Sequence, residues 1–214
     1  MTNTSPISVR GSHPSPGLIG EALRSAFMTV ICDLPETPAE RSQKWVVCLG
    51  HLLAQLKPWD SAHLLHKTWG RQKRALDYGE FVTDIAIVEK VNTAGIRTRS
   101  GSLQKVKHQP EYVRRMLLAV ESEFETNSQH QLDDLSKLLV VNAPVRIFVA
   151  SRAGNGIQSK LEPAQLRLFA DVISDVQGEI FMIALMPHPR HWRAGMQVKE
   201  ISVFLYSAGD WATC

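Results

Sequence analysis

The stretch that most constrains the fold runs from Met116 to Lys137, MLLAVESEFETNSQHQLDDLSK. Its first five residues are apolar and typical of a strand, and they lead directly into Glu121 and Glu123. Because strand side chains alternate between faces, these two acids are predicted to lie on the same side of a strand end. Two carboxylates placed there repel each other and lose hydration, unless a cation or a proton lies between them. The stretch therefore predicts a cation or proton site.

The segment after this strand is predicted to form a helix that carries Lys137. A polar turn is followed by LDDLSKLL, in which the leucines recur at helical spacing. Lys137 has two interpretations. It can form an ordinary surface ion pair with Asp133, four residues earlier, or it can lie beside the paired acids. A strand with paired acids, a turn and a helix with a lysine form a workable frame for metal-assisted hydrolysis.

Composition indicates one globular domain inside the cell. The chain has 214 residues, a formal net charge of +3 and three scattered cysteines, too few for a disulfide framework or a zinc cluster. It shows neither a signal-peptide pattern nor an apolar run of about 20 residues that could span a membrane. We expect a cytoplasmic protein with no membrane association. Residues 1–17, rich in Ser, Thr, Pro and Gly, are predicted to be a flexible tail, and residues 18–214 a single α/β domain.

The remaining chain predicts strands that alternate with helices. Helices are expected at 18–31, 39–56, 61–69 and 162–176, and strands at 78–89, 145–150, 179–186 and 198–206. The almost wholly apolar segment 145–150 is typical of an interior strand that is covered on both faces. This alternation favours an α/β fold with a mixed sheet, in which sites lie at the carboxyl ends of strands.

Asp84 is the third candidate acid. It lies within the predicted strand 78–89 among apolar neighbours, and a buried carboxylate without a partner costs several kcal/mol. If this strand pairs with the next one, Asp84 and Glu121 converge, with Glu123 as a third acid. Such a group of carboxylates would bind Mg²⁺ or Mn²⁺. Two plainer interpretations stay open: Glu123 as an exposed acid at a strand end, and the three acids as a polar network in an unrelated α/β protein.

These segments resemble a known family of nucleases. The residues that carry the resemblance are GEFVTD at 79–84, ESE at 121–123, DDLSKLL at 133–139 and VRI at 145–147. A strand Asp, an apolar strand that ends in Glu-x-Glu and a following helix are similar to the restriction-endonuclease-like PD-(D/E)XK superfamily, and in particular to a poorly characterised bacterial branch of it. The resemblance covers roughly residues 80–149, less than half of the chain, and its motifs are degenerate. It implies a central mixed β-sheet flanked by helices.

The resemblance also implies roles for individual residues. Asp84 matches the motif aspartate, and Glu121 matches the first acid of the second motif. Glu123 stands where most members have the catalytic lysine, and Lys137 fits members in which this lysine has moved to the following helix. Glu80 is an outlying acid, which is more often simply exposed. The resemblance implies a Mg²⁺- or Mn²⁺-dependent endonuclease acting on DNA. Because the usual lysine is missing, a catalytically inactive module that binds nucleic acid or a protein partner stays open.

A basic and aromatic segment near the C-terminus is the candidate nucleic-acid surface. Arg190 and Arg193 alternate with two histidines and a tryptophan, as in surfaces that contact phosphates and stack on bases. The same segment can also be an ordinary hairpin loop. The two histidines have no further ligands nearby in sequence, so a zinc site is not expected. The expected partner is nucleic acid, DNA rather than RNA, and a homodimer is left open.

Overall fold

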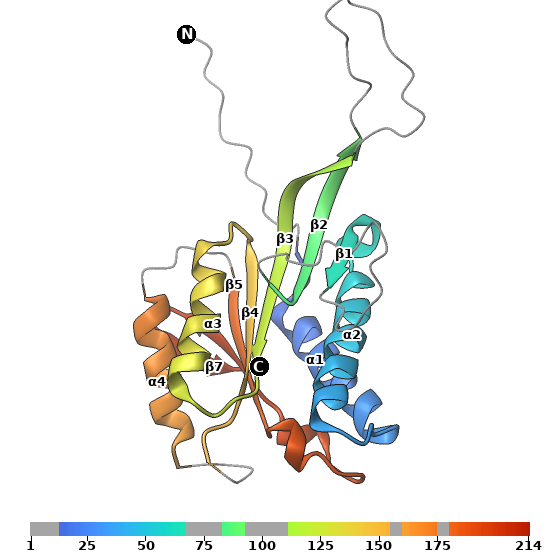
Figure 1. Ribbon diagram of the computed structural model, residues 1–214. Helices are drawn as coiled ribbons and strands as arrows, with labels where there is room; N and C mark the ends of the chain where they lie inside the picture. The colour runs from blue at the N-terminus through green and yellow to red at the C-terminus, as the bar shows by residue number, and fades with distance from the viewer. Residues whose placement is uncertain (1–12, 67–82, 93–110, 155–159, 175–179) are drawn as a thin grey trace, which may run out of the picture.

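The computed structural model describes residues 13–66, 83–92, 111–154, 160–174 and 180–214. These residues form a seven-stranded mixed sheet in which the spatial order of the strands is their order in the chain, β1 to β7 (Figure 1). The strands are β1 (His63–His66), β2 (Ile85–Asn92), β3 (Glu111–Glu123), β4 (Val145–Ser151), β5 (Ile180–Met186), β6 (Ser202–Ser207) and β7 (Asp210–Thr213). Every helix in the described ranges is too short or too polar to cross a lipid bilayer.

The centre of the sheet is parallel and its two sides are antiparallel. Strands β3, β4 and β5 run parallel, while β1 and β2 on one side, and β6 and β7 on the other, are paired antiparallel. Helix α3 (Ser128–Val140) connects β3 to β4, and helix α4 (Glu162–Ile173) lies between β4 and β5 in the chain. The α/β class with a mixed sheet is therefore confirmed.

Helices cover both faces of the sheet (Figure 1). Helices α1 (Pro16–Cys32) and α2 (Pro38–Ala54) pack on one face in a core with Ile85, Val120 and Ile147. Helices α3 and α4 pack on the other face, where their apolar side chains meet Phe148 and Ile183. Every residue of β4 and β5 is buried, as the almost wholly apolar sequence of β4 and the apolar sequence of β5 predict for strands covered on both faces.

The first two helices begin at capping residues followed by proline. Ser15 caps α1, and Thr37 caps α2 through a capping box in which Thr37 and Glu40 bond to each other. Helix α1 thus begins at Pro16, so the last two residues assigned to the N-terminal tail belong to the helix. Residues 1–12 lie outside the described ranges.

Two predicted elements are wrong in type or position. Over residues 61–66, the helix expected at 61–69 is instead the end of a short 3-10 turn, η1 (Trp59–Ser61), followed by edge strand β1, while residues 67–69 lie outside the described ranges. Four residues, HLLH, suit either structure locally, and pairing with β2 decides for the strand. The last strand expected at 198–206 begins with a 3-10 turn, η3 (Val198–Glu200), and only then becomes β6. Strand β7 was not predicted.

Candidate active site

Asp84 and Glu121 meet where β2 begins and β3 ends. Ile85 is the first residue of β2 and pairs antiparallel with Val120, so the preceding residue, Asp84, lies beside Glu121. Asp84 does not stand within a strand, as the sequence predicted, but in a bend just before β2. A carboxylate with apolar strand neighbours would lie unpaired in the core, whereas at this position Oδ2 of Asp84 reaches hydrogen-bond donors.

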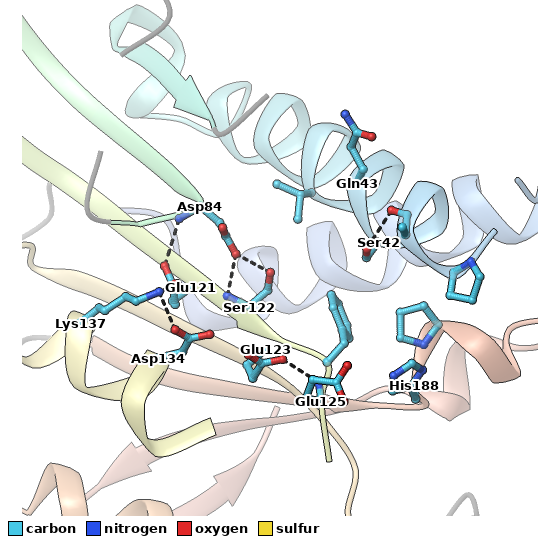
Figure 2. Close-up of a pocket in the computed structure, with 15 residues that line it drawn as sticks. Ser42, Gln43, Asp84, Glu121, Ser122, Glu123, Glu125, Asp134, Lys137 and His188 are labelled. Carbon is cyan, nitrogen blue, oxygen red and sulfur yellow. Dashed lines mark hydrogen bonds and ion pairs between the residues drawn. The ribbon is translucent and has the colours of Figure 1, made fainter. Parts of the chain in front are cut away.

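The two acids are held by reciprocal hydrogen bonds (Figure 2). Oδ2 of Asp84 accepts hydrogen bonds from the backbone N–H of Ser122 at 3.0 Å and from its hydroxyl at 2.5 Å. Oε2 of Glu121 accepts from the backbone N–H of Asp84 at 3.1 Å. Each acid is thus fixed by the segment that carries the other. Oδ1 of Asp84 makes no hydrogen bond to any described residue.

Lys137 points from α3 into this acidic site rather than along the helix surface. Its Nζ lies 2.7 Å from Oε1 of Glu121 and 2.5 Å from Oδ1 of Asp134. Asp133, the alternative partner, accepts instead from the side chain of Gln129 at 2.8 Å. Of the two interpretations, the structure therefore places Lys137 beside the paired acids.

Burial and neighbouring charges shift the protonation of both members of this ion pair. The Glu121 side chain is only 4% exposed. Burial, and then the charge of Asp84, raise the pKa of Glu121 to about 7, although Lys137 opposes the shift. Burial alone would lower the pKa of Lys137, but its bonds to Asp134 and Glu121 outweigh that effect and raise the pKa. Lys137 is therefore a cation at neutral pH.

Glu123 lies beside Glu121 in the same pocket, on the side of β3 that the sequence predicted. It follows Glu121 on the same strand face, but its carboxylate accepts from the backbone N–H of Glu125 at 2.6 Å and faces Asp134. Burial, with a further contribution from Asp134, raises the pKa of Glu123, although its bond to the Glu125 amide opposes the shift. No three Asp, Glu, His or Cys side chains in the described ranges come together in a group that could hold a metal ion.

The side chains present fit a divalent cation held by two carboxylates. Mg²⁺ commonly binds to one or two carboxylates and completes its shell with water and substrate phosphate. Asp84 and Glu121 supply such a pair, since Oδ1 of Asp84 makes no hydrogen bond to a described residue and the Glu121 carboxylate lies directly beside Asp84. Mn²⁺ accepts the same oxygen ligands.

The acids open into a pocket of about 530 Å³, which we call the acidic pocket. One wall is formed by β3 and α3, and the opposite wall by the N-terminal half of α2, including Ser42 and Gln43 (Figure 2). Sequence reasoning missed Asp134, Ser122 and these α2 residues. A signal existed for Asp134: it lies three residues from Gln131 and four from Leu138, both buried, and so on the inward side of α3.

Arg190 and Arg193 lie outside the acidic pocket. They line a second, smaller pocket of about 240 Å³, and His188 belongs to the walls of both pockets. The aromatic part of the predicted surface is not available, because Trp192 is only 2% exposed and packs against Phe27 and Phe124. The expectation that Trp192 could stack on bases is therefore wrong.

Comparisons with family models, with curated proteins and with solved structures find no match to this chain. Any functional conclusion therefore rests on the geometry of the two pockets. Glu80, the outlying acid of the predicted motif, lies outside the described residues.

Proposed function

We propose that this protein is a Mg²⁺- or Mn²⁺-dependent endonuclease that hydrolyses phosphodiester bonds in DNA, with a restriction-endonuclease-like arrangement of its site. One observation carries the proposal. Lys137 on α3 is bonded to Glu121 of the Asp84–Glu121 pair, at the strand end where the pocket opens. The mixed sheet between two layers of helices is consistent with that arrangement.

Asp84 and Glu121 would hold the cation, and Glu123 would lie behind them against Asp134. When bound, the metal polarises the phosphodiester and lowers the pKa of a coordinated water. Ser122 fixes the Asp84 carboxylate through two hydrogen bonds, so that its remaining oxygen keeps one direction. Such fixed ligands need little reorganisation during the reaction.

Lys137 would act as a fixed cation rather than as a base. An ammonium group has three donors, and Glu121 and Asp134 accept two of them, which leaves one for the attacking water or a phosphate oxygen. Because the two acids raise the pKa of Lys137, it does not accept a proton near neutral pH. Its role would be to orient the water and to stabilise negative charge on the pentacoordinate phosphate.

The proposal is tested by replacing Asp84 with Asn. The variant keeps the size of the side chain but removes a charge that the metal requires, so we expect Mn²⁺ binding, measured by calorimetry, to weaken at least ~10-fold. Cleavage of single- and double-stranded DNA and of RNA should fall with it. Asp133→Asn is the matched control, since Asp133 is an acid on α3 that bonds to Gln129 and does not line the pocket.

Two results would count against this function. If Asp84→Asn binds Mn²⁺ as tightly as the wild type, the acid pair is not the metal site. If the wild type binds the ion but cleaves none of the three substrates, the chain is instead the inactive binding module, as the acid at Glu123 in place of the usual lysine allows.

A further inference from the structure

The second pocket is the feature that the proposed hydrolysis does not use. It lies beyond the carboxyl ends of β4 and β5 and shares His188 with the acidic pocket. Its charged and ionisable wall residues are Arg152, His188, Arg190, His191, Arg193 and Glu200. We call it the cationic pocket, because three arginines face a single acid there.

The arginines of this pocket differ in how their charge is compensated. Arg152 is buried, pairs with Glu162 at 2.6 Å and donates to the backbone oxygen of Glu200 and the hydroxyl of Ser202. It forms part of the pocket floor. Arg190 and Arg193 are exposed, and neither forms an ion pair with a described acid. Their positive charges are therefore available to a ligand.

The segment that carries these arginines is held rigidly on the body of the protein. It contains the 3-10 turn η2 (Pro189–His191), whose ends are bound by Arg41 of α2: Nη1 donates to the backbone oxygens of Pro189 at 3.0 Å and Trp192 at 3.1 Å. Trp192 fills the core beneath the turn and donates from its indole nitrogen to the backbone oxygen of Pro187 at 2.7 Å. A preorganised wall of this kind loses little entropy on binding.

His188, between the two pockets, is suited to donate a hydrogen bond. Its Nδ1 accepts from the backbone N–H of Arg190 at 3.0 Å, so the proton of the neutral ring lies on Nε2. Burial and the charge of Arg190 lower the pKa of His188, which keeps the ring neutral near pH 7. A negatively charged ligand beside it would favour the charged ring and gain a stronger donor.

We propose that the cationic pocket binds a phosphate group of the same nucleic-acid strand whose scissile phosphodiester lies in the acidic pocket. The inference rests on the proposed function for the acidic pocket. Because His188 lies in the walls of both pockets, one strand of nucleic acid can pass from one pocket to the next. The acidic pocket has an excess of negative charge for a metal ion, and the cationic pocket has an excess of positive charge for a phosphate. Because Trp192 is buried, it does not stack on bases, and we assign the exposed arginines of the pocket to the phosphate backbone.

The test is a binding measurement that needs no cleavage. Arg190→Gln combined with Arg193→Gln is compared with Lys160→Gln combined with Arg167→Gln, which removes the same charge from exposed positions outside both pockets. Fluorescence anisotropy follows a short labelled DNA strand in EDTA, between about 50 and 200 mM salt. We expect the pocket variant to bind at least ~10-fold more weakly at the lower salt concentration, and its log–log salt slope to be smaller by about one unit per lost phosphate contact.

A variant of opposite sign makes the test specific to the pocket. Glu200 is the acid of the pocket wall, so Glu200→Gln removes a repulsion and should tighten binding of the same strand, by about twofold to tenfold. The proposal is overturned if the pocket variant and the surface control lose affinity equally, because the effect is then one of net charge alone. It is also overturned if Glu200→Gln weakens binding while its melting temperature is unchanged.

The source of the phosphate is settled with strands that carry either a phosphate or a hydroxyl at the 5′ end. Tighter binding of the phosphorylated strand, lost in the pocket variant, identifies a terminal phosphate. Equal binding of both strands, with both weakened in the variant, identifies an internal phosphate. Either result supports the pocket. If the wild type binds the strand through the cationic pocket but never cleaves it, the proposed hydrolysis is wrong and the phosphate site is supported. If the wild type cleaves and the pocket variant binds as tightly as the wild type, the hydrolysis is supported and the phosphate site is wrong.

Discussion

The two pockets share His188 at the carboxyl ends of the central strands, yet they differ in whether their charged side chains have partners of opposite charge. In the acidic pocket, side chains compensate each other: Lys137 bridges Glu121 and Asp134. In the cationic pocket, Arg190 and Arg193 have no acid partner among the described residues, and the binding that fixes their segment comes from Arg41 through backbone oxygens. Ion pairs between side chains therefore fix the acidic pocket, whereas hydrogen bonds to backbone oxygens fix the cationic pocket.

This difference indicates which changes each pocket tolerates. A substitution in the acidic pocket leaves a buried partner uncompensated, so it should alter both chemistry and protonation. A substitution of an exposed arginine leaves no buried charge behind, since Arg190 bonds at 3.0 Å to the exposed ring of His191, so it should change affinity without changing the fold. The cationic pocket is instead sensitive to the residue that fixes its backbone. The following three predictions probe this contrast.

The largest effect is expected for Lys137→Met, which keeps the apolar stem and the helix propensity of the side chain but removes its charge. Loss of one fixed donor to the transition state should slow cleavage by ~10²–10³. DNA affinity should be nearly unchanged, because the cationic pocket is intact. Initial rates with Mg²⁺ check the prediction, with Lys160→Met as the control at an exposed position. Wild-type rates in the variant would reduce Lys137 to a structural ion pair.

The second prediction concerns the pH dependence of stability. The pKa of Glu121 is raised from its ordinary value of 4.5 to about 7, so the folded state holds a proton that the unfolded state releases. The contribution of Glu121 to stability is therefore full below pH 4.5 and is lost as the pH rises through about 7. Because glutamine does not titrate, the free energy of unfolding of Glu121→Gln, relative to that of the wild type, should rise by up to a few kcal/mol between about pH 5 and 8.

Urea denaturation at the two pH values measures this gain. Glu21 of α1 provides the control, because Glu21→Gln removes an exposed acid outside both pockets and should show no comparable trend. A difference between Glu121→Gln and the wild type that does not vary with pH would mean that Lys137 keeps Glu121 ionised throughout. The acidic pocket would then be as fully compensated as an ordinary surface ion pair.

The smallest effect is expected for Arg41→Met, which removes the donors to Pro189 and Trp192. Loss of these hydrogen bonds should lower the free energy of unfolding by about 1–3 kcal/mol. DNA affinity should fall several-fold, as the cationic pocket loses its fixed wall, while Mn²⁺ affinity at Asp84 stays unchanged. Arg41→Lys should restore part of the DNA affinity. If metal and DNA affinity fall together, the two pockets are not independent.

The fold class was predictable because the sequences of the central strands are enough by themselves to identify them as buried strands. Strand β4 is almost wholly apolar and buried throughout, so its sequence indicates both its type and its interior position in the sheet. Edge strand β1 was not predictable, since its four residues are fixed by pairing with β2 rather than by their own pattern. Local sequence says little about structure that depends on a distant partner.

The sequence predicted which residues belong to the candidate site better than it predicted how they are arranged. Asp84, Glu121 and Lys137 were identified from residue type and spacing, and the structure brings them together. The helical spacing suggested Asp133 as a surface partner of Lys137, whereas in the folded protein Lys137 pairs with Asp134 and Glu121. Likewise, the alternating pattern around Trp192 suggested a surface, but a bulky aromatic ring beside a short turn fills the core instead.

The strand order of the sheet has a consequence for how the two pockets form. Each strand pairs with the strand before it in the chain, so no strand must insert between two that are already paired. During synthesis from the N-terminus, the sheet can grow by addition at one edge. The paired acids and Lys137 are supplied by the bend before β2, by β3 and by α3, whereas the cationic pocket needs the segment after β5. Asp84, Glu121 and Lys137 can thus come together during synthesis before the wall of the cationic pocket exists.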